Sequence, residues 1–311
     1  MTASAPTPFG NVFGPTAISP EVAAFHQRMV EMLRGMPGVW DVGIEAARLG
    51  GFMPQAPRSP RSFDRHVDRN VSIHVVPAQS PRGVYLHIHG GAMLLGSATS
   101  QDPMLERIAQ HVGLTCVSVE YRLAPEHPYP AAWDDCEVAA LWLARNARAE
   151  FGSDALLIGG ESAGASLAVP TMVRMRDRHG YSGFRGANLS FGIYDSGMTP
   201  SARAAKQGVL KASDVARNAA AYCPNPLQLQ NPDVSALYAD LRGLPPALFT
   251  VGSLDGFLDD SMFMYCRWLS AGNRAEIGIW PGADHAFIDT PHPLAAAANE
   301  SIDAFLNGCL Q

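Results

Sequence analysis

This chain of 311 residues contains very few lysines, and its cysteines have no regular spacing. The five cysteines are odd in number and scattered without C-x-x-C spacing, which argues against a disulfide framework or a zinc site and favours a reducing compartment. Only two of the 23 basic residues are lysine and the net charge is −6, so there is no electrostatic case for nucleic acid or an anionic membrane surface. No apolar run approaches a membrane span, and the first residues do not have the pattern of a secretory signal. We therefore expect a soluble, cytoplasmic protein with neither a nucleic-acid nor a membrane partner.

Apolar residues, by contrast, are abundant enough for one continuous core. They make up 47% of the chain against 17% charged residues, which is typical of a globular protein. Strands are predicted at residues 71–76, 84–88, 114–120, 155–158, 188–194, 247–251 and 275–280. Helices are predicted at residues 21–33, 103–111, 131–148, 163–178, 212–222, 259–269 and 294–306. This alternation predicts an α/β fold in which a mostly parallel central sheet is flanked by helices.

Two segments break the alternation and are predicted to form a helical cap. Residues 1–55 are rich in proline, glycine and alanine, and residues 195–235 are irregular. The second segment is expected near the carboxyl edge of the sheet, where ligands bind in such folds. We expect one domain over residues 1–311, with a catalytic core at about 70–194 and 236–311.

The segment Gly160-Glu161-Ser162-Ala163-Gly164 carries the strongest chemical signal in the chain. It follows a short apolar strand and precedes a helix, the context in which G-x-S-x-G forms a nucleophile elbow. A serine at the tip of so tight a turn needs small neighbours, which Gly160 and Gly164 supply. The helix that begins after it directs free backbone N–H groups at developing negative charge. Ser162 is therefore the predicted nucleophile.

A nucleophilic serine needs a general base and an acid that orients this base. His285 is the predicted base, because it lies between the last predicted strand and the last helix. Asp255 is the predicted acid, because it follows the preceding strand and completes the chain order serine, acid, histidine that α/β-hydrolases use. Asp259 and Asp260 are rivals, and their place at a helix start suggests N-capping and complement of the helix dipole instead.

The oxyanion donors are predicted to be the backbone N–H groups of Gly90, Gly91 and Ala163. Glycines let the backbone approach a substrate carbonyl without an intervening Cβ, although a glycine pair after a strand also forms ordinary turns. His89 is expected to hold this loop through hydrogen bonds. Its alternative role is to bind a metal ion together with His87, but no further ligand follows at suitable spacing, so we expect no metal.

Four motifs together resemble the hormone-sensitive-lipase-like (bacterial family IV) esterases of the α/β-hydrolase superfamily. They are His89-Gly90-Gly91-Ala92, Tyr121-Arg122-Leu123-Ala124-Pro125-Glu126, Gly160-Glu161-Ser162-Ala163-Gly164, and Asp255 with His285-Ala286-Phe287. The resemblance covers the chain from about residue 70 to its end. It implies a carboxylic-ester hydrolase with a mobile cap, short to medium acyl esters as substrates, no cofactor and a homodimer.

The chain departs from the family pattern at three positions. Ala92 replaces the third glycine, and its Cβ is expected to narrow the site. Glu161, a supporting residue beside the nucleophile, stands where aspartate is commoner, and Gly256 replaces the proline that usually follows the acid. None of these changes removes a chemical group that catalysis needs.

The sequence thus predicts an acyl-enzyme mechanism through Ser162, His285 and Asp255. An amidase or another acyl hydrolase on the same residues is one alternative. A small-molecule receptor without turnover is the other, and the presence of all three triad residues argues against it.

Overall fold

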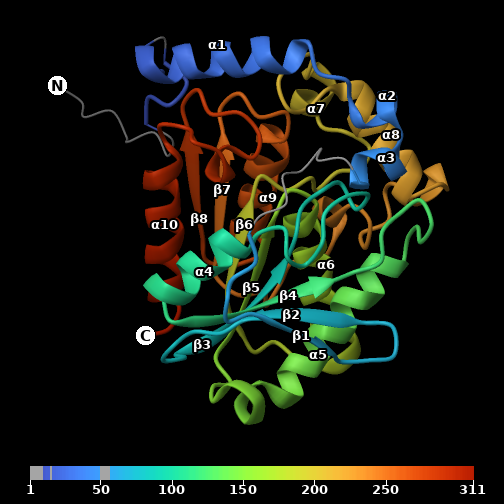
Figure 1. The fold of residues 1–311 in the computed structure, drawn as a ribbon, viewed down its shortest axis with the longest axis vertical. Coiled ribbons are helices and arrows are strands. Elements are labelled where there is room, and N and C mark those ends of the chain that lie inside the picture. The colour runs from blue at the N-terminus through green and yellow to red at the C-terminus, as the bar shows by residue number, and fades with distance from the viewer. Residues whose placement is uncertain (1–9, 15, 50–56) are drawn as a thin grey trace.

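A computed structural model describes residues 10–14, 16–49 and 57–311 of the chain. Its centre is one eight-stranded sheet in the order β1-β2-β4-β3-β5-β6-β7-β8 (Figure 1). Strands β3 to β8 run parallel, and at one edge β2 pairs antiparallel with β4 and β1 pairs antiparallel with β2. The strands are β1 (Phe63–His66), β2 (Ser72–Val76), β3 (Gly83–Ile88), β4 (Leu114–Glu120), β5 (Leu156–Glu161), β6 (Phe184–Ser190), β7 (Ala247–Gly252) and β8 (Ala275–Trp280). This sheet confirms the predicted α/β class.

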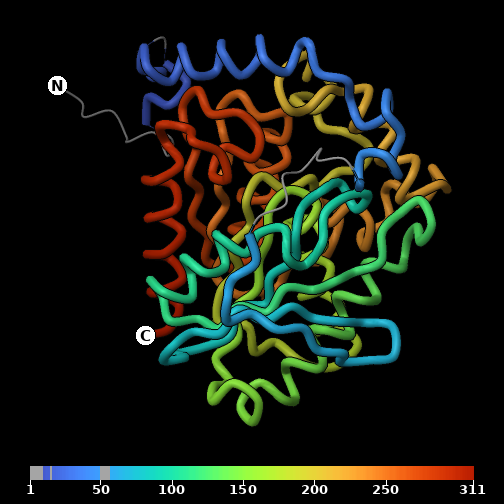
Figure 2. Tube along the Cα trace, in the orientation of Figure 1, coloured from blue at the N-terminus to red at the C-terminus, as the bar shows by residue number. Residues whose placement is uncertain are grey.

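Helices cover both faces of the sheet and bury it completely along its central strands. The flanking helices are α4 (Asp102–His111), α5 (Ala131–Phe151), α6 (Ala163–His179), α9 (Leu258–Ser270) and α10 (Ala295–Gly308). Side chains of α5, α6 and α9 share one apolar cluster with Leu86 of β3. Side chains of α4 and α10 share the other cluster with the neighbouring Tyr85, because successive residues of a strand point to opposite faces. The result is a three-layer arrangement (Figure 2).

The remaining helices gather at the end of the molecule toward which β7 and β8 point (Figure 1). They are α1 (Pro20–Arg34), α2 (Val39–Val42), α3 (Ile44–Leu49), α7 (Pro200–Ala204) and α8 (Ala212–Tyr222), with short 3₁₀ turns at η1 (Pro226–Gln228), η2 (Ala236–Tyr238) and η3 (Phe287–Asp289). Two segments far apart in sequence meet here, since the indole Nε1 of Trp40 donates a hydrogen bond to Asn218 Oδ1 at 2.9 Å. Ser19 starts α1 by accepting the N–H of Val22 at 3.3 Å, ahead of Pro20 in the first turn.

The structure corrects two expectations about strands. Strand β6 ends at Ser190, whereas the sequence predicted a strand over 188–194; Phe191, with φ +38°, begins a loop whose apolar side chains pack around the site. Strand β1 was not predicted, because its sequence Phe-Asp-Arg-His belongs to a largely exposed edge strand without apolar alternation. Within the described residues, no helix is both long and apolar enough to cross a bilayer.

Candidate active site

Ser162 occupies the sharp turn between β5 and α6, in a strained conformation with φ 54° and ψ −119°. The turn is tight because β3 lies directly against it. A Cβ on Gly160 would lie 2.1 Å from the backbone oxygen of Ile88, and one on Gly164 would lie 1.8 Å from the same oxygen. The Ser162 N–H donates to the carbonyl oxygen of Ser190 at 2.9 Å, which fixes the turn to β6. The sequence and the packing therefore expose one serine hydroxyl above the sheet.

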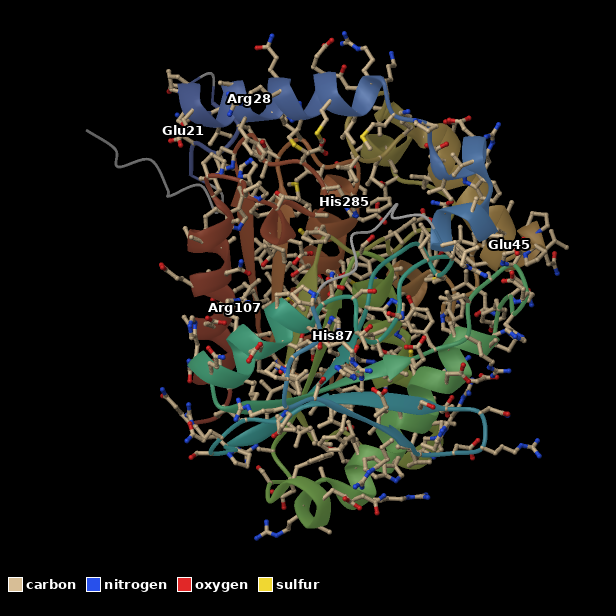
Figure 3. The ribbon with its side chains drawn as sticks, in the orientation of Figure 1. Glu21, Arg28, Glu45, His87, Arg107 and His285 are labelled. Atoms are coloured by element: carbon tan, nitrogen blue, oxygen red, sulfur yellow. The ribbon has the colours of Figure 1, made fainter. Side chains whose placement is uncertain are left out.

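The structure brings Ser162, His285 and Asp255 into one hydrogen-bonded chain. His285 Nε2 lies 2.9 Å from Ser162 Oγ, and His285 Nδ1 lies 3.0 and 3.1 Å from the two oxygens of Asp255. A carboxylate only accepts, so Nδ1 carries the proton and the lone pair of Nε2 faces the serine hydroxyl. Asp255 follows β7 and His285 follows β8, as the sequence predicted. In Figure 3, His285 lies below the helices at the top of the view, and His87 lies further down, in the sheet.

The imidazole of His285 is shielded from water on two sides. The rings of Phe191 and Phe257 contact it edge-on, with centroids at 4.9 and 5.3 Å. Burial alone would lower the pKa of His285, but the Asp255 carboxylate more than offsets this effect and raises the pKa above its ordinary value. This environment suits a general base that becomes an imidazolium beside a fixed negative charge.

The rival carboxylates bind a neighbouring segment instead. Asp259 accepts the N–H of Ser201 at 2.8 Å. Asp260, fully buried, accepts the N–H groups of Tyr194 and Asp195 at 2.7 and 2.9 Å. The N-cap of α9 is Phe257, so the N-capping role expected for these two residues is wrong. Asp259 ties α7 to α9, and Asp260 ties the loop after β6 to α9.

The oxyanion loop differs from the prediction at one donor. The Gly90 N–H already donates to Glu161 Oε1 at 2.9 Å, so it is not free to bind an oxyanion. The backbone N–H groups of Gly91, Ala92 and Ala163 donate no hydrogen bond to any described residue. Ala92 takes a left-handed φ of 57°, which turns the chain beside the nucleophile. The loop thus has a free N–H at Ala92, whereas the sequence suggested the N–H of Gly90 as a donor.

Two buried histidines support this loop from below. His89 lies 2.8 Å, through Nδ1, from the carbonyl oxygen of Gly90 and stacks on Tyr121, with ring centroids 4.1 Å apart. Burial lowers the pKa of His89 to about 4, so the ring is neutral and its Nδ1–H is the donor to that carbonyl. His87 contacts Ser118 Oγ through Nδ1 and Glu161 through Nε2, both at 2.9 Å. Glu161 therefore joins the sheet to the oxyanion loop.

Both nitrogens of His87 are thus engaged by protein groups, as is one nitrogen of His89. In the part of the chain that the structure describes, no three His, Cys, Asp or Glu side chains are grouped so that they could hold a metal ion. The two histidines that the sequence placed near each other belong to the hydrogen-bond network of the loop.

A cavity of about 370 Å³, its open mouth included, adjoins the serine. Ser162 and Ala92 contribute to its lining from the core. Helix α8 contributes Val215, Asn218 and Tyr222. The segment predicted as cap therefore lines the space that a substrate would occupy.

Sequence reasoning missed several residues that support the site. Arg48 of α3 donates to the carbonyl oxygens of Leu94 and Ala124 at 2.8 and 2.7 Å and pairs with both oxygens of Glu126 at 3.0 Å. Gln101 donates to Glu161 at 3.0 Å. A lone arginine and a lone glutamine carry no spacing signal, so nothing in the sequence pointed to them.

Comparison with known proteins gives matches over most of the chain. Residues 85–289 match a family described as alpha/beta hydrolase fold. An acetyl-hydrolase of Streptomyces hygroscopicus is 29% identical over 231 residues, 74% of this chain and 76% of that protein. Esterase LipI of Mycobacterium tuberculosis is 31% identical over 60% of this chain and 59% of its own length. The structure of a Pyrobaculum calidifontis esterase is similar with a TM-score of 0.81 and 27% identity, covering 94% of this chain and 98% of that one.

Proposed function

The chain belongs to the α/β-hydrolase family, and on that premise we propose that it is a serine carboxylesterase with Ser162 as its nucleophile. The observation that carries the proposal is the single chain of hydrogen bonds from Asp255 through His285 to the Ser162 hydroxyl. The esterases and the acetyl-hydrolase among its relatives support carboxylic esters as the substrate class. Such a site needs no cofactor, because all the groups for acyl transfer are protein groups.

In the first half of the reaction, Ser162 Oγ attacks the ester carbonyl while His285 Nε2 takes the hydroxyl proton. The imidazolium that forms is stabilised by the Asp255 carboxylate at 3.0 Å. His285 then gives this proton to the departing alkoxide, which leaves as the alcohol. The acyl group remains on Ser162 as an ester.

In the second half, a water molecule replaces the alcohol. His285 takes a proton from this water as it attacks the acyl carbonyl, and it returns the proton to Ser162 Oγ when the acid leaves. In both halves the oxyanion is bound by the free N–H groups of Gly91, Ala92 and Ala163. One such donor is worth about 3 kcal/mol in the transition state.

We propose the helices α1 to α3, together with α7 and α8, as a cap that sets substrate size. The apolar side chains that α8 presents to the cavity support this assignment, as do the hydrogen bonds from Trp40 and Arg48 to other parts of the site. Ala92 stands in the lining of the cavity where a glycine would have no side chain. Short to medium acyl chains fit such a partly filled, apolar space.

The test is hydrolysis of p-nitrophenyl esters of graded chain length by the purified protein and by Ser162→Ala. We expect turnover that disappears in the variant, with an optimum at short to medium acyl chains. Asp255→Asn should lower kcat by orders of magnitude, about 10⁴-fold where the orienting carboxylate is lost. Asp259→Asn is the matched control, and a larger loss there would refute the choice of acid. Activity of Ser162→Ala equal to wild type would refute the nucleophile.

We propose a cytoplasmic location and a homodimer as two further properties. Five free cysteines, three of them buried, suit a reducing compartment. Light scattering of the purified protein tests the dimer, and a monomeric mass at all concentrations would overturn it. Cell fractionation tests the location.

A further inference from the structure

Asn218 is the polar residue that α8 presents to the cavity beside the nucleophile. Its neighbours in the lining are apolar, with Val215 one turn before it on the same helix and Leu210 and Phe257 nearby. Tyr222, one turn after it, has its hydroxyl committed to Ser196 Oγ at 2.9 Å. A polar amide in an otherwise apolar lining calls for a physical explanation.

The hydrogen bond from Trp40 determines which end of the amide is engaged and which end is free. An indole N–H can only donate, so the atom 2.9 Å from Trp40 Nε1 must be the oxygen of Asn218. The amide nitrogen, with two N–H donors, therefore points away from the indole. Among the described residues, this nitrogen donates no hydrogen bond, whereas the amide oxygen accepts the one from Trp40. Trp40 thus holds Asn218 as an oriented donor.

The rest of the lining decides what this donor can bind. No charged side chain is part of the described lining of the cavity. An anionic group of a ligand would lose its hydration there without a compensating cation, whereas a neutral carbonyl or ether oxygen would gain a hydrogen bond. A wholly apolar ligand would leave the amide donors unpaired in a dry contact, which disfavours it.

We infer that Asn218 determines specificity, and that the preferred substrates are esters with a neutral oxygen acceptor some atoms away from the scissile carbonyl. The inference rests on the proposed esterase function and narrows its substrate class. The backbone and side-chain donors then have separate tasks: the N–H groups of Gly91, Ala92 and Ala163 bind the reacting oxygen, and the Asn218 amide binds the distant one.

The experiment uses two pairs of esters that match in size and differ by one acceptor. On the acyl side, p-nitrophenyl 4-oxopentanoate is compared with p-nitrophenyl 4-methylpentanoate. On the alcohol side, 2-methoxyethyl butyrate is compared with butyl butyrate. The ratio of kcat/KM within each pair is measured for the wild type and for Asn218→Leu, so that intrinsic reactivity cancels between the two proteins. In at least one pair we expect the ratio to fall roughly threefold to tenfold, the range that one net hydrogen bond provides.

Val215→Leu is the control, because it changes the size of the same wall and no polar group. It should alter both members of each pair by the same factor, so that the ratio stays constant. Ratios that are equal in wild type and Asn218→Leu for both pairs would overturn the inference while leaving the esterase intact. A ratio that Val215→Leu lowers as much as Asn218→Leu would also overturn it, because size would then explain the effect.

Absence of turnover with every ester would refute the proposed function and still leave Asn218 testable. The four esters are then titrated calorimetrically into Ser162→Ala and into Ser162→Ala combined with Asn218→Leu. Tighter binding of an acceptor-bearing ester that is lost in the double variant supports the inference, and equal affinities in the two proteins refute it.

Discussion

In the proposed mechanism, the imidazole of His285 sets the pH range in which the enzyme works. The ring is desolvated, which lowers its pKa, yet the adjacent Asp255 carboxylate raises the pKa above the ordinary value of 6.5. Only the neutral ring can accept the proton of Ser162, so activity should fall as the pH decreases through this raised pKa. The kcat/KM of a p-nitrophenyl ester, measured against pH, should show an acid limb whose midpoint lies above 6.5.

Asp255→Asn provides the control for this profile, since it removes the main cause that raises the pKa. Its residual activity should show an acid limb shifted to lower pH. A wild-type rate that stays constant far below the ordinary histidine value would exclude a histidine base.

Glu161 connects three parts of the site, because its carboxylate binds Gly90, His87 and Gln101 at 2.9 to 3.0 Å. Glutamine at this position keeps the shape and one acceptor for Gly90. Its amide can donate to His87 if that ring changes tautomer and donates to Ser118 Oγ. We expect Glu161→Gln to retain most stability and Glu161→Ala to lose roughly 2–4 kcal/mol, since buried donors then stay unpaired. Urea unfolding of both variants measures this difference, and equal losses would contradict the network.

At the scale of single residues, the sequence predicted which residues come together better than it predicted which hydrogen bonds they make. Ser162, Asp255 and His285, which the structure joins in one chain of hydrogen bonds, could be singled out because the proposed catalysis demands particular residue types at strand ends. Gly90 was misjudged because the glycine pattern does not reveal which N–H already has an acceptor; the Glu161 carboxylate that takes it lies 71 residues further along the chain.

The contact between α6 and β3 positions the nucleophile at the level of whole elements. A Cβ on Gly164 would lie 1.8 Å from the Ile88 carbonyl oxygen. That oxygen belongs to the backbone, so it cannot move aside as the end of a flexible side chain could. Gly164→Ala should therefore destabilise the protein by more than about 3 kcal/mol or prevent folding. Gly308, in α10, has no atom within 4 Å of an added Cβ, so Gly308→Ala is the matched helical control.

We expect Gly308→Ala to be neutral or to stabilise by about 0.5–1 kcal/mol, since alanine is the better helix former. Thermal melts of the two variants give the comparison. A Gly164→Ala protein as stable as Gly308→Ala would show that α6 does not require close approach to β3.

Strand boundaries were predicted correctly for some strands and not for others, and burial on both faces does not separate the two groups, since β6 is buried on both faces and β8 largely is not. Strands β4 and β8 begin and end at the predicted residues. The apolar residues after Ser190 misled the prediction because they are buried for another reason: Phe191 packs against the ring of His285 rather than within the sheet. Hydrophobic periodicity indicates burial, and it does not distinguish a strand from a loop that lines a site.

On the scale of the whole molecule, the site depends on contacts between the beginning of the chain and its middle. Trp40 reaches Asn218 across 178 residues, and Arg48 reaches Glu126 across 78. Such pairs leave no trace in local pattern, so the sequence indicated a cap without showing what attaches it. The arrangement in Figure 1, in which α2 and α3 lie beside α8, follows from these long-range bonds.

Arg48 offers a test of that attachment. Its guanidinium donates to the carbonyl oxygens of Leu94 and Ala124, and Leu94 belongs to the loop that follows the oxyanion donors. The pair with Glu126, which is 55% exposed, adds little because solvent screens it. Arg48→Ala should thus cost about 1–3 kcal/mol through the two charge-assisted bonds to carbonyls. It should also lower kcat, because the oxyanion loop loses its support.

Arg34→Ala is the matched control from the same segment, since among the described residues Arg34 pairs with Glu31 alone and both side chains are about 70% exposed. Its free energy of unfolding should stay within about 0.5 kcal/mol of wild type, with unchanged kcat. The free energy of unfolding and the kcat of Arg48→Lys should lie between those of Arg48→Ala and Arg34→Ala, because one ammonium cannot span both carbonyls as the planar guanidinium does. If Arg48→Ala behaves like Arg34→Ala in urea unfolding and in kcat, the N-terminal helices only cover the core. If instead the three variants follow the expected order, these helices are part of the machinery that holds the oxyanion loop in place.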